Sequence, residues 1–381
     1  MKFIVSKKAL EVAVKNLCRV INTKNSLPIL GDILCEVDEK MNTLHMTASD
    51  SEIWLSCFVG LDSTEGGGRF CVPAAQLADA LRGLVEQPLT ITATAESDMM
   101  FTLEHATGQV HFPIENADEY PTSPETEDNA VVTMLAKDLQ KAITTVSFAT
   151  ANDTNRPVME GVEFNFMKTV ADVVASDGHI LMMYRFLRSY GCVGSFIMPK
   201  KVARIVPSML MPNNDDEVSV VWNERQGSIE HENWVLTFRL IEDRYPKYES
   251  IIPKGSPWYC NVDTKQLMNA VKKVQPFANT SSSMIVANFE ADKLSVSADD
   301  YDFQSGATDS IMAESNVQEP LAIGLKSTSI ISILSKIPYP TVTIQMEAPN
   351  RAVVFVEQKT EDNPKETVKV VALSMPMLVN E

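Results

Sequence analysis

A helical spacing of apolar residues occurs three times along this chain, at nearly equal intervals. Leu10, Val14 and Leu17 fall on one face of a helix predicted over residues 6–19, because positions three and four apart share a helix face. The same spacing predicts helices over 136–147 and 264–275. The apolar faces of these two copies are formed by Leu139, Ile143, Val146, Leu267, Val271 and Val274. One helical segment is therefore present in three copies.

Each copy also contains a second predicted helix and several alternating stretches. The second helices follow short strands and are predicted over 74–84, 200–210 and 326–337. Alternation of polar and apolar residues, with many β-branched side chains, predicts strands; these include 90–94, 218–222 and 342–346. Helices and strands within each copy indicate the α+β fold class.

A short acidic turn follows an alternating stretch in every copy, at Asp50, Asp177 and Asp300. A repeat of this length is too long for a solenoid and indicates that a whole domain was copied. Tyr120-Pro121 and Tyr245-Pro246 close the first two copies, because proline stops a strand. We therefore predict three domains, at residues 1–128, 129–254 and 255–381.

The composition is that of a globular protein. Of the 381 residues, 45% are hydrophobic and 22% are charged, and no stretch approaches the roughly 20 apolar residues of a membrane helix. The N-terminal segment meets Glu11 before any long apolar run, unlike a secretory signal. The six cysteines stand singly, with no C-x-x-C pair, which favours reduced thiols over zinc or disulfides. We predict a cytoplasmic protein without metal or cofactor.

The charges of this chain are segregated rather than mixed. The net charge is −17, yet the six predicted helical windows hold 15 of the 33 basic residues and only 3 of the 50 acidic ones. In the first helix, Lys8, Lys15 and Arg19 lie opposite the apolar face. Solvation of an amphipathic helix would explain the lysines of one helix, but not the missing acids of all six. The pattern favours a surface that faces a polyanion.

No base-reading motif accompanies these basic faces. The helical windows contain neither zinc-finger spacing nor a basic zipper nor a stacking-aromatic motif. Lysine and arginine would then contact phosphates, which position a protein on a duplex without reading its sequence. We predict a curved array of repeated units around nucleic acid.

Four short motifs carry a resemblance to a known family. They are Lys24-Asn25-Ser26-Leu27-Pro28-Ile29-Leu30, Ala175-Ser176-Asp177-Gly178-His179, Tyr245-Pro246 and Met375-Pro376-Met377. With these motifs in the same order and on the same threefold repeat, the chain resembles the bacterial DNA polymerase III beta subunit, the sliding clamp, along its whole length. The resemblance implies a non-catalytic protein that encircles DNA and confers processivity on the replicative polymerase.

The resemblance also implies an assembly. Two chains would join head to tail as a homodimer, so that six α+β clamp-type domains form a ring with antiparallel sheets outside and helices lining the hole. The expected dimer interface contains Val110 and Phe277. Residues expected to face DNA are Lys24, Arg82, Lys137, Lys141, Arg156, Lys200, Lys201, Arg204, Lys265 and Lys272.

By the same resemblance, partner proteins would dock a short peptide into an apolar groove between the second and third domains. The expected partners are the replicative polymerase subunit, the clamp loader, other polymerases and repair proteins. Flexible methionines suit such a groove because they repack around different ligands. Its residues would be Met159, Ser176, Gly178, His179, Leu181, Pro246, Ile251, Ser329, Leu373, Met375, Pro376 and Met377.

Several residues near this groove depart from the family's common pattern. Ile180 stands where an arginine often follows the histidine, and Ser250 replaces another frequent arginine. Ser329 stands where a tyrosine is common, and the chain continues beyond Met377 with Leu378. We therefore expect a less basic groove.

Two alternative functions compete with the clamp interpretation. A metal-assisted hydrolase would use Asp50, Asp177 and Asp300 together, but equivalent residues of separate repeats lie far apart. Asp177-Gly178-His179 lacks a third group that would complete a catalytic site, and a turn glycine beside a groove-lining histidine explains it better. A scaffold that binds only protein would leave the segregated lysines unexplained.

Overall fold

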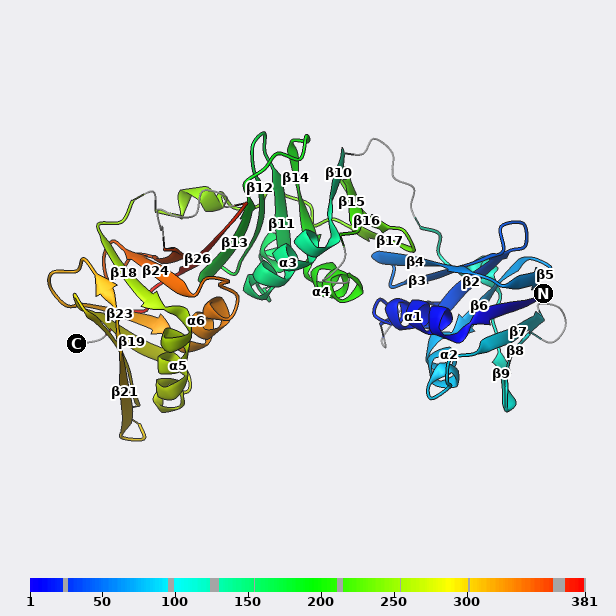
Figure 1. The fold of residues 1–381 in the computed structure, drawn as a ribbon, viewed down its shortest axis with the longest axis horizontal. Coiled ribbons are helices and arrows are strands. Elements are labelled where there is room, and N and C mark those ends of the chain that lie inside the picture. Colours follow the sequence, from blue (N-terminus) through cyan, green and yellow to red (C-terminus); the bar gives the residue numbers. More distant parts are fainter. Residues whose placement is uncertain are drawn as a thin grey trace. The chain divides into compact units, whose positions relative to one another are not determined.

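Helices form where the repeated apolar spacing predicts them. The computed structural model describes residues 1–22, 27–94, 99–123, 130–153, 155–210, 215–253, 255–300, 302–358 and 367–379, and Figure 1 shows its elements. The long helix of each repeat is α1 (Lys7–Leu17), α3 (Ala136–Val146) or α5 (Thr264–Val274). The second helices are α2 (Ala74–Leu81), α4 (Lys200–Met209) and α6 (Ser327–Leu334). Within the described ranges, no helix is both long and apolar enough to span a membrane.

Side-chain caps fix where two of the long helices begin. Ser6 Oγ accepts a hydrogen bond from the N–H of Ala9 at 3.3 Å, and Asp263 Oδ1 accepts one from the N–H of Gln266 at 2.8 Å. Such caps satisfy backbone donors that the first helical turn leaves without a partner. The helix starts that we predict near residues 6 and 264 are confirmed to within one residue.

The structure divides into two compact units, which we describe separately. Unit 1 comprises residues 1–137 and 208–240 and contains two antiparallel sheets. The five-stranded sheet has the order β5 (Ser63–Glu65), β1 (Lys2–Ser6), β7 (Pro88–Thr94), β8 (Met100–His105) and β9 (Gly108–Pro113). The eight-stranded sheet has the order β10 (Ala130–Leu135), β15 (Glu217–Trp222), β16 (Gln226–His231), β17 (Trp234–Arg239), β4 (Ile53–Gly60), β3 (Thr43–Ser49), β2 (Asp32–Asp38) and β6 (Gly68–Pro73).

Unit 2 comprises residues 138–207 and 241–381 and also contains two antiparallel sheets. The nine-stranded sheet has the order β14 (Gly194–Pro199), β11 (Gly161–Phe166), β12 (Ala171–Ser176), β13 (Ile180–Phe186), β26 (Val368–Ser374), β25 (Val353–Glu357), β24 (Thr341–Met346), β18 (Trp258–Asp263) and β22 (Glu314–Ser315). The four-stranded sheet has the order β21 (Ser305–Met312), β20 (Lys293–Asp300), β19 (Met284–Phe289) and β23 (Leu321–Lys326).

The apolar faces of the helices pack against the sheets. Leu10, Val14 and Leu17 of α1 are buried, and α1 packs on β1, β3 and β4 beside α2 (Figure 1). In unit 2, α5 packs against α6 and on β18, β20 and β21. Burial alternates along strands such as β7 and β20, because successive side chains point to opposite faces of a sheet. The polar faces of the helices are therefore left at the surface.

The two large sheets run without a break from one repeat into the next. β4 of the first repeat pairs with β17 of the second, with Ile53 opposite Phe238. β13 of the second repeat pairs with β26 of the third, with Ile180 opposite Ser374. The N–H groups of Arg239 and Met375 donate to the carbonyls of Glu52 and His179, each two residues after the turn aspartate, so the two junctions have the same register. The compact units do not coincide with the repeats. The strands of the second repeat are divided between the eight-stranded sheet of unit 1 and the nine-stranded sheet of unit 2.

Candidate functional site

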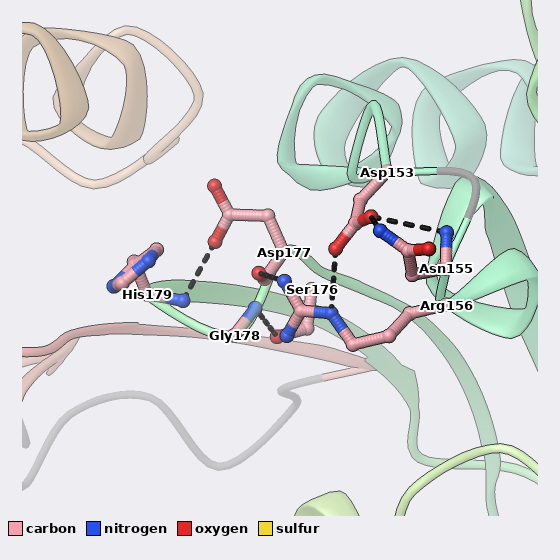
Figure 2. Close-up of polar contacts among 7 residues, drawn as sticks. All are labelled: Asp153, Asn155, Arg156, Ser176, Asp177, Gly178 and His179. Atoms are coloured by element: carbon pink, nitrogen blue, oxygen red, sulfur yellow. Dashed lines mark hydrogen bonds and ion pairs between the residues drawn. The ribbon is translucent and has the colours of Figure 1, made fainter.

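The acidic turn of the second repeat is stabilised by its own side chains (Figure 2). Asp177 Oδ1 accepts hydrogen bonds from the N–H groups of His179 and Ile180, both at 2.8 Å. Ser176 Oγ accepts one from the N–H of Gly178 at 3.1 Å and donates to the carbonyl of Ile180 at 2.8 Å. Gly178 has a φ of +90°, which residues with a Cβ rarely adopt. The turn thereby holds Gly178 and His179 exposed at the surface.

The same turn recurs in the other two repeats. Asp50 Oδ1 accepts hydrogen bonds from the N–H groups two and three residues later, and Asp300 Oδ1 does the same. Short acidic side chains commonly form such local bonds to the backbone. Each carboxylate is used by its own turn, which disfavours the hydrolase alternative.

Arg156 lies over the turn of the second repeat (Figure 2). Its Nε donates to Asp153 Oδ2 at 2.9 Å, and this bond contributes most to holding the pKa of Asp153 below its ordinary value. Its Nη2 lies 3.5 Å from the carbonyl oxygen of Asp177. A methyl group on Gly178 would lie 2.8 Å from Arg156 Nη1, so the glycine leaves room for the guanidinium. Arg156, predicted to face DNA, therefore places its charge beside the predicted groove.

The C-terminal segment runs beside the same turn. The N–H of Met375 donates to the carbonyl of His179 at 2.8 Å, and the N–H of Met377 donates to that of Gly324 at 2.8 Å. One residue before Ser374, Leu373 of β26 lies opposite Leu181 of β13. These contacts bring predicted groove residues of the second repeat next to those of the C-terminal segment.

Buried apolar side chains lie beneath this region. Leu181, Leu373 and Tyr248 belong to one buried cluster, against which Tyr245 packs. A cavity of about 780 Å³ adjoins the cluster and has Pro246, from the predicted groove, in its wall. Its other lining residues are Glu163, Asn165, Met183, Arg185, Tyr245, Lys247, Tyr248, Glu249, Ser250, Ile252, Pro253, Lys369 and Val371. The cavity extends the region beyond the residues that the sequence identified.

The predicted groove residues differ in exposure in the way that the floor, wall and rim of a groove differ. The buried ones are Ser176, Leu181 and Leu373. The half-buried ones are Met159, Pro246, Ser329, Pro376 and Met377. The exposed ones are Gly178, His179, Ile251 and Met375.

A buried ion pair beside the cavity was missed in the sequence. Arg185 donates to the two carboxylate oxygens of Asp172 at 2.6 and 2.7 Å, and the Asp172 side chain is fully buried. Tyr248 donates to Asp172 Oδ2 at 2.8 Å, and Asn165 donates to the Tyr248 hydroxyl at 3.0 Å. The one available signal was an acidic residue within an otherwise apolar strand. This network ties β12 and β13 to the 3₁₀ helix η5 (Tyr248–Ser250).

The acidic residues within the helical windows are each neutralised by a neighbouring cation. The ion pairs are Glu11 with Lys7 at 2.8 Å, Asp79 with Arg82 at 2.9 Å, and Asp138 with Arg188 at 2.6 Å. The other basic residues of the windows are therefore not offset by carboxylates of the same helices.

The residues predicted to face DNA differ in exposure and in whether a local partner holds their charged group. Lys137 pairs with Asp215, and Lys200 Nζ donates to the carbonyls of Thr150 and Ala151, so local partners hold both. Lys201, like these two, is half-buried. The exposed members are Arg82, Lys141, Arg156, Arg204, Lys265 and Lys272, and Lys24 lies outside the described residues.

The residues predicted at the dimer interface lie at two different sheets. Val110 is in β9, the edge strand of the five-stranded sheet of unit 1. Phe277 ends the 3₁₀ helix η6 (Gln275–Phe277), which packs on edge strand β21 of unit 2. Phe303, which follows the third acidic turn, is 76% exposed and was not singled out in the sequence. Its place after the repeated turn was the available signal.

Three α+β repeats, joined by sheets that continue from one repeat into the next, define a three-domain clamp-type protein. Family models of the DNA polymerase III beta subunit match the chain at residues 1–124 (N-terminal domain), 133–247 (central domain) and 249–377 (C-terminal domain). The chain belongs to the DNA polymerase III beta subunit family.

Relatives and solved structures match along the whole chain. The beta sliding clamp of Vibrio cholerae is 24% identical over 377 residues, which cover 98% of this chain and 100% of the relative. The beta sliding clamp of Synechocystis sp. is 23% identical, with 100% of both chains covered. The DNA polymerase III subunit beta of Pseudomonas aeruginosa has a TM-score of 0.91 at 22% identity, and the DNA polymerase sliding clamp of Bacillus subtilis 0.89 at 19%, each covering 100% of both chains. The fold is therefore shared over the full length.

Proposed function

We propose that this protein is the processivity clamp of a bacterial replicase, a ring that encircles double-stranded DNA and tethers the polymerase. The observation that carries this proposal is the set of basic helix faces on a threefold clamp-type fold. The six helical windows hold 15 basic and 3 acidic residues, and each of the three acids is paired with a cation. The helix faces are therefore positive, although the whole chain has a net charge of −17. Such a surface fits a polyanion better than it fits a scaffold for proteins alone.

The strand order supports closure of a ring by two chains. Within the chain, the strand after each acidic turn pairs with the last sheet strand of the next repeat, as β4 does with β17 and β13 with β26. By this rule β21 needs a partner equivalent to β17, and that strand is β9. Both β9 and β21 are edge strands in the described chain, and an open edge is a template for another strand. A head-to-tail contact of this kind closes into a ring when its rotation fits.

The register of the internal junctions predicts which residues meet between chains. Ser305 takes the place of Ile53 and Ile180 in the sheet register, and Phe112 takes the place of Phe238. Ser305 of one chain would then lie opposite Phe112 of the next, with Ala307 opposite Val110. Phe277 and Phe303, 41% and 76% exposed, add apolar surface near the same edge. We propose a homodimer held by this strand pair.

The basic helix faces would line the hole of the ring and contact phosphates. Lys141, Arg204, Lys265 and Lys272 are the strongest candidates, because within the described ranges no ion pair holds them. Contacts to phosphate are screened by salt and carry no sequence information, so a ring held this way can slide. Lys137 and Lys200 would contribute less, since each already has a local partner.

The surface around His179 and Met375 would bind short peptides of the replicative polymerase, the clamp loader, other polymerases and repair proteins. Buried Leu181 and Leu373 give it an apolar floor, and Met375 adds an adaptable rim. Arg156 would supply a positive charge at this groove. The groove would therefore be more basic than Ile180 alone predicts. We propose that the three domains are residues 1–128, 129–254 and 255–381. The protein would act in the cytoplasm, where a separate ATP-driven protein would load it, and it would have no catalytic activity of its own.

Retention on circular DNA tests this proposal. The protein is loaded onto nicked circular DNA by a matched loader and then challenged by linearisation. A topological ring stays on circles and runs off freshly cut ends at high salt. If cutting changes nothing, or circles retain no protein, the ring is wrong and the protein scaffold becomes the better interpretation.

A further inference from the structure

A pocket of about 450 Å³ lies in unit 1, between α1 and the paired strands β4 and β17. Pockets of about 300–1,000 Å³ are typical of small-molecule sites. Its apolar lining consists of Ala9, Val12, Ala13, Cys57, Phe58, Val59, Gly60 and Trp234, and its polar lining of Ser6, Lys8, Asn16 and Asn233. Every lining residue belongs to unit 1, so the pocket is complete within it.

Small side chains leave this pocket open. Ala9, Ala13 and Gly60 contribute little volume, and a Cβ on Gly60 would meet no heavy atom within 4 Å. Val12 is 52% exposed on the helix face that also carries Lys8.

The equivalent place in the third repeat is crossed by an ion pair. Lys273 is the tenth residue of α5, as Asn16 is of α1. Asp309 lies in the sheet register where Cys57 lies in the first repeat, opposite the residue four places before the turn aspartate. Lys273 Nζ donates to Asp309 Oδ2 at 2.8 Å. The third repeat therefore has an ion pair at the positions where the first has Asn16 and Cys57.

The second repeat is closed in another way. Asp138 corresponds to Ala9 as the third residue of its helix, and it pairs with Arg188 at 2.6 Å. Lys141 stands in place of Val12, and Leu187 in place of Gly60. Of three equivalent positions, the first alone combines small residues with an apolar wall and no ion pair across it, within the described residues.

The electrostatics of the pocket favour an anion. No carboxylate lines it, and within the described ranges no ion pair holds Lys8. Glu86 contacts the lining from outside the pocket, where its carboxylate accepts a hydrogen bond from Ser6 Oγ at 2.7 Å. Burial raises the pKa of Cys57 to about 12, so this thiol is neutral at pH 7 and acts as part of the apolar wall. One cation beside an apolar wall is the complement of an amphipathic anion.

We propose that this pocket binds a small amphipathic anion, with its apolar body against Val12, Cys57 and Trp234 and its acidic group near Lys8. Aromatic carboxylic acids are the chemical class that fits this combination. The site is separate from the peptide groove, which lies in unit 2, and does not depend on the clamp function.

Methyl NMR of the full-length protein, labelled at alanine and valine, tests the proposal with 2-naphthoate as the probe. We expect saturable shifts at Ala9, Val12, Ala13 and Val59. Gly60→Leu adds, at a lining position, the side chain that the second repeat has at the equivalent residue, and should weaken binding at least about tenfold. Gly31→Leu is the matched control, because its Cβ also meets no heavy atom within 4 Å and lies outside the pocket; it should leave binding unchanged.

A neutral analogue separates the pocket from the charge preference. Lys8→Ala should weaken 2-naphthoate about two- to fivefold, the effect of one exposed ion pair, and leave 2-naphthylmethanol unchanged. Shifts that do not saturate, that map to other methyl groups or that survive Gly60→Leu would overturn the pocket. Equal loss for both probes in Lys8→Ala would overturn the anionic class.

Discussion

The backbone N–H of Met375 donates to the carbonyl oxygen of His179 at 2.8 Å. This hydrogen bond fixes the C-terminal segment against the acidic turn without using either side chain. The Met375 side chain is left 38% exposed, and His179 is exposed as well. Both side chains are thus free to contact a partner while the backbone that carries them stays in place.

Met375→Ala should weaken peptide binding while the ring keeps its hold on DNA. Loss of an apolar contact at the rim of a peptide site should cost on the order of 1 kcal/mol, or about a fivefold change in Kd. Fluorescence anisotropy with a labelled peptide from the cognate polymerase measures the change. Met41→Ala, at a methionine of unit 1 that is 71% exposed, is the control. An unchanged Kd for Met375→Ala would remove this residue from the groove.

Asp172→Ala should destabilise unit 2 strongly. The substitution leaves Arg185 with only the exposed Glu249 at 3.3 Å and removes the acceptor of the Tyr248 hydroxyl. Breaking a buried ion pair typically costs about 3–5 kcal/mol of unfolding free energy. Urea unfolding followed by circular dichroism measures this.

The matched control for the buried pair is Glu36→Ala. Glu36 pairs with Arg69 at 2.8 Å, and both side chains are more than 40% exposed. Such surface pairs contribute about 0–1 kcal/mol. Similar losses in the two variants would show that burial of Asp172 does not decide the cost.

Glu163→Gln should change how stability depends on pH. Burial raises the pKa of Glu163 to about 7 from 4.5, and a hydrogen bond with Ser195 opposes the shift. The folded state therefore binds this proton more tightly than the unfolded state. The stability it contributes is fully present below pH 4.5 and is lost as the pH rises toward about 7.

A glutamine at position 163 cannot ionise, so the variant should be more stable than the native protein at pH 8. Near pH 4.5 the advantage should shrink. Urea midpoints at the two pH values measure the difference, with Glu104→Gln, at the exposed residue of β8, as the control. Parallel pH profiles for all three proteins would contradict the assigned role of Glu163.

Val110→Cys combined with Ala307→Cys should give a covalent dimer on mild oxidation. Directly opposed residues of antiparallel strands have Cβ atoms about 4.5–5.5 Å apart, close enough for a disulfide after small adjustments. Gln109→Cys with Ala307→Cys shifts the pair by one residue and is the control. Non-reducing electrophoresis should show one dimer band for the first pair only. A ladder of larger species would argue for an open chain of subunits instead of a ring.

The helices of this fold could be predicted because their packing is local in sequence. Leu10, Val14 and Leu17 define a buried face whatever lies opposite, and Asp263 marks the start of α5 by its own hydrogen bond. The continuity of the large sheets could not be predicted. A strand such as β4 alternates in the same way whether its partner belongs to its own repeat or to the next.

The sequence could predict which residues form the candidate site, but not where their side chains point. Motifs pointed to the turn at Gly178 and to the segment at Met375, and the structure brings both together. The resemblance predicts that Arg156 faces DNA, and the sequence alone gives no rotamer for its side chain. Its direction depends on the pairing with Asp153 and on the space above Gly178. Arg185 and Asp172 face each other only through the register of β12 and β13.

The shared sheets also limit how this protein can be divided or recombined. A fragment that ends after the first repeat would strip β17 from β4 and expose a strand whose side chains are mostly buried. An open, mostly apolar edge of that kind is a template for pairing with other chains, so we expect the fragment to aggregate instead of folding alone. A chimera with a repeat from a distant relative would succeed only if the donor kept the pairing of Ile53 with Phe238. The strand pairs that join the repeats therefore limit which repeats can be exchanged, as much as the cores of the repeats do.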